Sequence, residues 1–372
     1  MLNTDSKVPV KTDEQSVTQQ PSCEVLKMHQ EMLSKALRHY WSNLKNSIKA
    51  RRYIKIRGLE ASSIERFGLG YADSASQGLR SVFPNYHVPA LVACGLVKEN
   101  GNKRYDRFRD RLIFPILNEE GRVVAFGGRL FDGDGPKYLN SPQTALFDKG
   151  STLFGIPQAK ASIGQSGQVI VVEGYMDVVM AAQYGIENIV ATLGTATTSS
   201  HIEKLILSGV REIVFCFDGD DAGRMAAEKA LFAALAKVHT ASIKVFFTFL
   251  PSSEDPDSFI RANGADAFRE VIAKSQPIEE YLLQILREGK DLGSSEGRAN
   301  LTCEALDYLA MIKDAAMFYR LCEQIAHDTQ FTVAELINFV GETPRTWFPG
   351  TVDDCQFLTS AQVEADASTK VA

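Results

Sequence analysis

The chain has 372 residues, of which 45% are hydrophobic and 23% are charged, and its formal net charge is −6. These values are ordinary for a soluble globular protein of two or three domains, and no apolar run approaches the length that spans a bilayer. The six cysteines are neither paired at CxxC spacing nor placed beside a histidine at ligand spacing, which argues against a zinc ribbon or a disulfide framework and fits a reducing cytoplasm.

The charges are distributed unevenly along the chain. The net charge is +10 over residues 26–160 and −14 over residues 161–372. A basic half joined to an acidic half that carries metal is expected of an enzyme that acts on a polyanion. Solvated helix faces explain the basic stretches equally well, so charge alone does not choose between these two interpretations.

The N-terminal part is predicted to be a disordered leader followed by helices. The first 22 residues are polar, carry both signs of charge and lack the apolar core of a signal peptide, and we expect the leader to cover residues 1–25. From residue 26 to residue 55 the pattern is helical, with apolar residues recurring at Leu37, Tyr40, Trp41, Leu44 and Ile48. A short helix over 62–67 is expected to follow.

Residues 104–149 have the pattern of strands and turns. Arg107, Arg109 and Arg111 alternate with other residue types, so on a strand the three arginines would share one face. Two apolar segments, 112–117 and 122–126, flank a turn at 118–121 and predict a hairpin. A domain boundary is expected at 165–167, which gives a basic α+β lobe over residues 26–165.

Strands and helices alternate over residues 166–275. Strands are predicted at 169–173, 188–193, 212–217 and 243–250, and helices at 176–184, 200–208, 222–238 and 257–273. This alternation predicts an α/β domain with a doubly wound parallel sheet. Ser200 with Glu203 fits a capping box in this domain, and Thr332 with Glu335 fits another in a helical lobe expected over 276–342. Residues 343–372 are polar and are expected to form a disordered tail.

Acidic residues follow three of the predicted strands: Glu173, then Asp218 and Asp220, then Asp255 and Asp257. Because ligands bind at the carboxyl ends of the strands in such sheets, we expect these carboxylates to meet at one edge. Their mutual repulsion calls for cations, and oxygen ligands without His or Cys suit Mg²⁺ or Mn²⁺. Paired hard metals beside a basic groove indicate phosphoryl or nucleotidyl transfer.

Structural roles compete with these functional ones. The Asp218-Gly219-Asp220 sequence is a common turn, Asp221 is expected to be the N-cap of the next helix, and Asp257 fits a cap for a helix that starts at Ser258. A basic set fits phosphate contacts, although any one member fits an ordinary surface position. This set comprises Arg57, Arg107, Arg109, Arg111, Lys137 and Lys149.

Several ordered motifs resemble the catalytic core of bacterial-type (DnaG-type) DNA primases. The Toprim domain of that family is similar to the segments VVEGYMDVVMAAQYGI (171–186), ATLGTATT (191–198), FDGDDAGRMAAEKAL (217–231) and LPSSEDPDSFI (250–260). Its basic N-terminal lobe is similar to RYDRFRDRLIFPI (104–116), GRVVAFGGR (121–129), PKYLNSP (136–142) and LFDKG (146–150). The resemblance runs from about residue 40 to residue 275, and the helical stretch to about residue 341 is compatible with the third lobe of the core.

The resemblance implies a template-directed RNA polymerase that starts chains de novo from NTPs on single-stranded DNA. Glu173, Asp218 and Asp220 match the family's acidic catalytic and metal positions, and Asp255 and Asp257 match its further metal-site carboxylates. The positions linked to nucleotide or template contact are matched by Arg57, Arg107, Arg109, Lys137, Asn140 and Lys149.

The chain departs from the family pattern in two ways. The Cys/His cluster of a zinc module is missing, so no zinc is expected in this chain. A replicative helicase would be a partner, but residues 342–372 are too short and polar for its docking domain, and 278–341 are expected to be used by the core. We expect a cytoplasmic protein without a membrane partner, either an excised core or a compact primase from a phage or mobile element.

Three hypotheses about activity remain at this point. The first is a primase core, in which the carboxylates hold metal and the basic set holds triphosphate or template. The second is a Toprim nuclease or phosphotransferase that uses the same carboxylates to cut nucleic acid. The third is a non-catalytic module that binds nucleic acid or nucleotides, and it leaves the complete acidic set unexplained.

Overall fold

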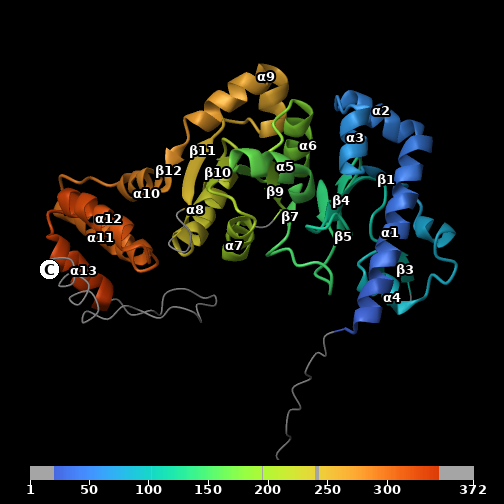
Figure 1. The fold of residues 1–372 in the computed structure, drawn as a ribbon, viewed down its shortest axis with the longest axis horizontal. Helices are drawn as coiled ribbons and strands as arrows, with labels where there is room; N and C mark the ends of the chain where they lie inside the picture. The colour runs from blue at the N-terminus through green and yellow to red at the C-terminus, as the bar shows by residue number, and fades with distance from the viewer. Residues whose placement is uncertain (1–20, 102, 195, 239–242, 343–372) are drawn as a thin grey trace, which may run out of the picture.

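A computed structural model describes residues 21–101, 103–194, 196–238 and 243–342. Figure 1 shows three parts in a row, with an N-terminal lobe at one end, a central sheet with its helices in the middle, and the C-terminal helices at the other end. The expected disordered tail, and residues 1–20 of the expected leader, lie outside the described residues.

The N-terminal lobe begins with the helices α1 (Cys23–Asn46), α2 (Ile48–Ile56) and α3 (Ala61–Phe67). Because α1 begins at Cys23, the leader predicted to reach residue 25 is too long. Ser47 ends α1 and accepts a hydrogen bond from the backbone of Ala50 as the N-cap of α2, which divides the predicted continuous stretch. The predicted apolar pattern is only partly buried: Tyr40 is 1% exposed, whereas Ile48 is 77% exposed.

The lobe continues with short elements and an antiparallel sheet. The short elements are β1 (Gly70–Ala72), η1 (Gly78–Ser81), α4 (Pro89–Ala93), β2 (Val97–Asn100) and β3 (Lys103–Asp106). The main strands are β4 (Arg111–Leu117), β5 (Val123–Leu130) and β6 (Tyr138–Asn140), in the order β1-β4-β5-β6. The predicted hairpin is confirmed, since β4 pairs antiparallel with β5 across a turn in which Gly121 has a φ of 78°.

The central sheet has six strands in the order β12-β11-β10-β8-β9-β7. The strands are β7 (Leu153–Phe154), β8 (Gln168–Val172), β9 (Ile189–Thr192), β10 (Glu212–Phe217), β11 (Lys244–Phe249) and β12 (Gln276–Pro277). The four inner strands are parallel, which confirms the predicted alternation. The edge strand β7 pairs antiparallel with β9, so the sheet extends into residues that we assigned to the N-terminal lobe.

Helices cover both faces of this sheet (Figure 1). They are α5 (Ile156–Ser166), α6 (Tyr175–Gln183), α7 (Ser199–Leu207), α8 (Asp221–Leu235) and α9 (Pro256–Ala273). The capping box predicted for α7 is wrong: its N-cap is Thr198, paired with His201, rather than Ser200 with Glu203. Gly264, with a φ of 84° and a ψ of 171°, kinks α9, the helical segment predicted at 257–273, into two parts.

The inner strands are buried on both sides, and successive side chains enter two different cores. Ile170 and Val172 of β8 pack with α6 and α9 and with residues of the N-terminal lobe such as Phe114. Val169 and Val171 face the other core, which continues into the C-terminal helices. The sheet is therefore the layer that joins all three parts of the chain.

The C-terminal part is helical, as predicted, and packs against the sheet. It comprises α10 (Ile278–Arg287), α11 (Ser295–Leu309), α12 (Ala315–Thr329) and α13 (Val333–Glu342). Tyr281 of α10 stacks on Phe247 of β11, with ring centroids 4.6 Å apart. The predicted capping box of Thr332 and Glu335 is confirmed by reciprocal hydrogen bonds. Across the described ranges, no helix combines the length and the apolar character needed to cross a membrane.

Candidate active site

The acidic residues expected at the strand ends do lie at the carboxyl edge of the central sheet. Glu173 directly follows β8, and Asp218 directly follows β10. These two strands are adjacent and parallel, with Val171 opposite Phe215, so the two carboxylates leave the sheet side by side. The local sequence accounts for this placement, because each strand is a continuous apolar run and its first polar residue lies where the chain leaves the core.

The electrostatics of this pair are unfavourable to two negative charges. Burial and the charge of Asp220 raise the pKa of Glu173, against a hydrogen bond from the backbone of Asp218. Burial and the charges of Glu173, Asp255 and Asp220 raise the pKa of Asp218 to about 7, and Lys137 opposes the rise. The pair is therefore poised either to retain a proton or to bind a cation.

Asp220 and Asp255 each begin a helix. Asp220 accepts a 2.8 Å hydrogen bond from the backbone of Gly223 as the N-cap of α8, so the expected capping role of Asp221 is wrong by one residue. Asp255 is the N-cap of α9 and accepts a 2.7 Å bond from the backbone of Ser258. Both carboxylates still act on Asp218, because each raises the pKa of that group.

Asp257 is engaged by arginines instead of standing free at the edge. It lies in the first turn of α9, is 4% exposed, and forms ion pairs with Arg261 at 2.8 Å and with Arg57 at 3.8 Å. The cap expected for a helix starting at Ser258 is thus wrong, since α9 begins at Pro256. The Arg57 contact ties the end of α2 to the start of α9, which joins the N-terminal lobe to the acidic edge.

The turn between Asp218 and Asp220 depends on Gly219 for space. A Cβ on Gly219 would overlap the carbonyl oxygen of Pro251 and approach that of Leu250 to 2.5 Å. Its backbone N–H bonds to the carbonyl oxygen of Glu254. We predicted that glycine would serve a tight turn here, and the structural reason is the close passage of the loop that follows β11.

The donor set fits a hard cation held by few protein ligands. Oε1 of Glu173 is buried and has no hydrogen-bond partner in the described part of the chain. A cation there would both satisfy this oxygen and relieve the repulsion from Asp218. Within the described ranges, however, no three His, Cys, Asp or Glu side chains are gathered closely enough to hold a metal ion by themselves. Ligands beyond this pair would come from water or substrate.

The three arginines expected on one strand face do not share one. β3 ends at Asp106 and β4 begins at Arg111, and the intervening Asp110 has a φ of 52°, so the alternation crosses a bend. Arg111 is 5% exposed, and its guanidinium donates to the carbonyl oxygens of Gly128, Pro136 and Lys137. The guanidinium of Arg111 is thus bonded to the backbone of its own lobe, and its role in nucleotide or template contact stays a prediction.

Arg107, Arg109 and Lys137 are placed differently from one another. Arg107 is half-buried and donates two bonds, of 2.9 and 2.6 Å, to the carbonyl oxygen of Asn140. Arg109 is exposed beside the ring of Tyr105. Lys137 is exposed and acts electrostatically on Asp218 from the other lobe. Arg109 and Lys137 are therefore accessible to a phosphate.

Asn140 and Lys149 link the N-terminal lobe to the central sheet. The side chain of Asn140 donates a 2.6 Å bond to the carbonyl oxygen of Leu193, just past β9, and accepts one from the hydroxyl of Tyr175. Lys149 is half-buried, and His201 contacts its carbonyl oxygen at 3.0 Å. The oxygen and the nitrogen of the Asn140 side chain thus each form a hydrogen bond within the protein, whereas the ammonium of Lys149 forms no ion pair within the described ranges.

Sequence reasoning missed two residues that shape the site, Tyr175 and His201, and assigned Asp177 either to the helix dipole or to a supporting role beside Glu173. Tyr175 anchors Asn140, His201 holds the Lys149 loop, and Asp177 is a buried carboxyl whose oxygen accepts a 3.3 Å bond from the backbone of Asp257. Burial raises the pKa of Asp177 well above its ordinary value, and the charges of Asp255 and Asp218 add to the effect. A charged residue in an otherwise apolar helix was the one available signal for Asp177.

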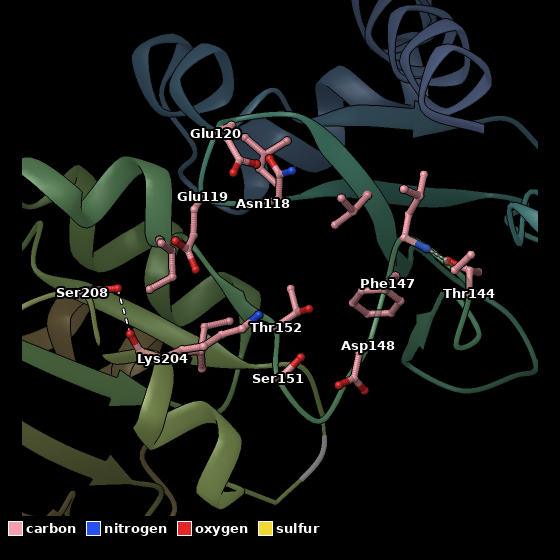
Figure 2. Close-up of a pocket in the computed structure, with 16 residues that line it drawn as sticks. Asn118, Glu119, Glu120, Thr144, Phe147, Asp148, Ser151, Thr152, Lys204 and Ser208 are labelled. Atoms are coloured by element: carbon pink, nitrogen blue, oxygen red, sulfur yellow. Dashed lines mark hydrogen bonds between the residues drawn. The ribbon is translucent and has the colours of Figure 1, made fainter. Parts of the chain in front are cut away.

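A separate pocket of about 360 Å³ lies away from the acidic edge. Figure 2 shows that it is bounded by the β4–β5 turn with Glu119 and Glu120, by the segment that carries Asp148 and Thr152, and by Lys204 of α7. None of the predicted site residues lines this pocket.

Comparisons with known proteins decide the family. Family models match residues 39–160 (DNA primase catalytic core, N-terminal domain), 167–246 (Toprim domain) and 279–333 (DnaB-helicase binding domain of primase). The crystal structure of a DNA primase domain from Pseudomonas aeruginosa has a TM-score of 0.80 and 41% identity, and the match covers 84% of this chain and 100% of that one. The chain belongs to the bacterial-type (DnaG-type) DNA primases.

Other primases support this assignment and show how much of a primase the chain covers. The DNA primase of Neisseria meningitidis serogroup A is 43% identical over 304 residues, which are 82% of this chain and 51% of that protein. A structure described as the DnaG primase catalytic domain bound to ssDNA has a TM-score of 0.78 and 34% identity, covering 84% of this chain and 100% of that one. The chain thus spans about half the length of the curated primases it matches.

The expected primase-core fold with a Toprim domain is confirmed. The expectation that no helicase-docking segment is present is contradicted by the family match at 279–333. That segment covers α10 from its second residue and the whole of α11 and α12. In this primase it shares a core with the Toprim sheet, so one stretch of chain both supports the sheet and resembles a helicase-binding domain.

Proposed function

We propose that this chain is an RNA-synthesising primase core, which joins NTPs into a short primer on a single-stranded DNA template. One observation carries the proposal: Glu173 and Asp218 leave adjacent parallel strands side by side with raised pKa values, opposite Lys137, in a chain of the primase family. Single-stranded DNA is favoured as the template by the likeness to the catalytic domain described as bound to ssDNA.

Glu173 and Asp218 would hold a divalent cation, Mg²⁺ or Mn²⁺, with Asp220 and Asp255 adding negative charge nearby. Such a cation supplies charge stabilisation to the attacking 3′-hydroxyl oxygen and to the triphosphate. Asp257 is assigned to positioning, because it is already neutralised by Arg57 and Arg261. Buried Asp177 supports it by accepting its backbone N–H.

The accessible basic side chains would bind the polyanionic substrates. Lys137 faces the acidic edge and Arg109 is exposed on the same lobe, so we assign them to the triphosphate or the template backbone. Lys149 has an unpaired ammonium among the described residues and is assigned the same role. Arg107 and Asn140 instead hold the lobe to the sheet edge.

The test is incorporation of labelled NTPs on single-stranded DNA with Mg²⁺ or Mn²⁺. Glu173→Gln and Asp218→Asn remove charge without changing size, and each should reduce synthesis about 100-fold or more. Asp221→Asn is the matched control, since that neighbouring side chain is 100% exposed and pairs only with Arg224 at 3.7 Å among the described residues. It should retain activity near that of the wild type.

Three outcomes would contradict the proposal. Metal-dependent cleavage of DNA without NTP incorporation would identify the carboxylates as those of a nuclease. Binding of DNA or nucleotide that survives both substitutions, with no chemistry in any variant, would identify a binding module. Equal synthesis by the wild type and by Glu173→Gln would remove the assigned role of the acidic edge.

We further propose that the outer surface of α10 to α12 contacts a replicative helicase. The family match over 279–333 supports this proposal. Tyr319, which is 42% exposed on α12, is available to a partner, whereas Tyr281 is 4% exposed and faces the sheet. Fluorescence anisotropy with a purified replicative helicase, comparing the wild type with Tyr319→Ala, would test it. Unchanged affinity together with unchanged folding would locate the contact elsewhere.

A further inference from the structure

His201 is a buried polar residue that the reaction does not use directly. It lies in the first turn of α7 and is 1% exposed. Its Nε2 lies 3.0 Å from the carbonyl oxygen of Lys149, and its Nδ1 lies 3.2 Å from the backbone nitrogen of Thr198. The hydroxyl of Thr198 donates to the carbonyl oxygen of Gly150. Two consecutive carbonyls of the Lys149 loop are thus bound to the start of one helix.

These partners determine the protonation state of the ring. A carbonyl oxygen is only an acceptor, so Nε2 carries the hydrogen that bonds Lys149. The backbone nitrogen of Thr198 is only a donor, so Nδ1 is unprotonated and accepts. The hydroxyl proton of Thr198 is already used on Gly150. His201 is therefore the neutral Nε2–H tautomer, and burial, which lowers its pKa, favours that state.

The loop itself is folded into a defined turn. Oδ1 of Asp148 accepts a 3.0 Å bond from the backbone of Gly150 and a 2.8 Å bond from the side chain of Gln143. Figure 2 shows the same segment from the pocket side, with Asp148, Ser151 and Thr152 lying along the loop and Lys204 on α7. The turn fixes the loop's shape, while His201 and Thr198 fix its place against the sheet.

We propose that His201 is a positioning residue that holds the Lys149 loop in place, so that the Lys149 ammonium reaches the phosphates of nucleotide or template. The role of Lys149 in binding phosphates rests on the proposed function. The anchoring of the loop by His201, which we call the latch, does not. Lys149 is half-buried, and its side chain is a flexible chain of four methylene groups. Because this side chain does not hold itself in one conformation, the position of its ammonium depends on the anchored backbone.

Trypsin gives a readout of the latch that is independent of activity. Cleavage after Lys149 requires the loop to open, and cleavage after Lys137, which is exposed and is not among the contacts of His201, is the internal control. His201→Ala should accelerate cleavage after Lys149 about tenfold and leave cleavage after Lys137 unchanged. Equal cleavage after Lys149 in the wild type and in His201→Ala would overturn the latch.

Two substitutions that are nearly isosteric with each other distinguish the latch from simple helix capping. His201→Gln retains both a donor for Lys149 and an acceptor for Thr198, whereas His201→Glu retains only the acceptor. The latch predicts slow cleavage in the Gln variant and fast cleavage in the Glu variant. If the role were capping alone, the two variants would behave alike. Thr198→Val, which removes the bond to Gly150, is a second route should His201→Ala fail to fold.

Primer synthesis then tests the positioning role. His201→Ala should raise the KM for NTP or template about tenfold with a smaller change in kcat. His201→Gln should have a KM close to that of the wild type. In a Lys149→Ala background, His201→Ala should add no further rise. An additional tenfold rise there would separate His201 from Lys149 and overturn the positioning role. If the wild type made no primer, the proposed function would fail, while the trypsin result would still decide the latch.

Discussion

The hydroxyl of Tyr175 donates a 2.6 Å hydrogen bond to the side-chain oxygen of Asn140, across the boundary between the Toprim sheet and the N-terminal lobe. Tyr175 is two residues past Glu173, and Asn140 is three residues past Lys137. The bond therefore sets the spacing between the acidic edge and the basic lobe. Gly127 makes room for it, since a Cβ there would approach the tyrosine ring to 2.5 Å.

Tyr175→Phe should remove this tie while keeping the buried ring. The oxygen of Asn140 would lose its donor, and we expect a loss of about 1–2 kcal/mol in the free energy of unfolding. Primer synthesis should fall further than stability alone explains, because the lobe carrying Lys137 would shift relative to Glu173. Denaturant unfolding and kinetics at saturating NTP measure the two effects. Tyr319→Phe, at an exposed tyrosine, is the control and should change neither.

The stability of the metal-free protein should depend on Asp218. Its pKa is raised to about 7, so the folded state holds a proton that the unfolded chain releases near pH 4. Stability contributed by that proton is present at low pH and is lost as pH rises from about 4 to about 7. In EDTA, Asp218→Asn should therefore reduce the decline of melting temperature with pH, and the part that remains comes from Glu173, Asp177 and Asp257, whose pKa values are also raised by burial.

Added Mg²⁺ should reverse this effect in the wild type. At pH 8 the ionised pair binds the cation, which should raise the melting temperature of the wild type and affect Asp218→Asn much less. Thermal unfolding with and without EDTA measures the difference. An equal rise in both proteins would show that Mg²⁺ acts somewhere other than at this pair.

Gly219→Ala should disable the site without a change of charge. The new methyl group would meet the carbonyl oxygens of Leu250 and Pro251, so the turn carrying Asp218 and Asp220 must move. We expect synthesis to fall at least tenfold and the free energy of unfolding to fall by about 1–3 kcal/mol. Gly164→Ala is the matched control, because that helical position has open space around it. It should leave activity intact and raise stability slightly. Full activity of Gly219→Ala would show that the turn tolerates displacement.

Tyr281→Ala should test whether the C-terminal helices are part of the catalytic unit. The substitution removes a 4% exposed ring stacked on Phe247 of the sheet, which should lower the free energy of unfolding by about 3–5 kcal/mol.

Deletion of residues 276–342 should leave an aggregating protein, because it uncovers the second core of the sheet. A soluble, active truncation would instead show that the helices are an independent module.

The positions of Glu173 and Asp218 were predictable, because apolar runs mark buried strands and parallel strands end at one edge. The caps were harder to predict. Several hydroxyl and acidic residues lie within three positions of each helix start, so the sequence offered near-equivalent choices at Thr198 and Asp255. Which of them caps depends on where the preceding loop leaves the sheet, and that is a tertiary property.

The basic residues show a different limit of prediction from the sequence. The alternation of Arg107, Arg109 and Arg111 is the signature of a strand, but a residue with positive φ at Asp110 breaks it. The carboxylate of Asp110 accepts a 2.9 Å bond from Tyr71 and a 2.5 Å bond from Lys49, both distant in sequence. Contacts between remote segments decided the local conformation, and no pattern within ten residues could have shown them.

The alternation of side chains along β8 links the two cores to the active edge. Val171 belongs to the core shared with the C-terminal helices, Val172 to the core shared with the N-terminal lobe, and Glu173 is the next residue. Close-packed interiors transmit changes of volume, so a cavity in either core would displace the same carboxylate. A selection for altered primer synthesis should therefore recover substitutions at buried positions of α11 and α12, remote from DNA and nucleotide. Such positions would let the rate be tuned without any change in the groups that perform the chemistry.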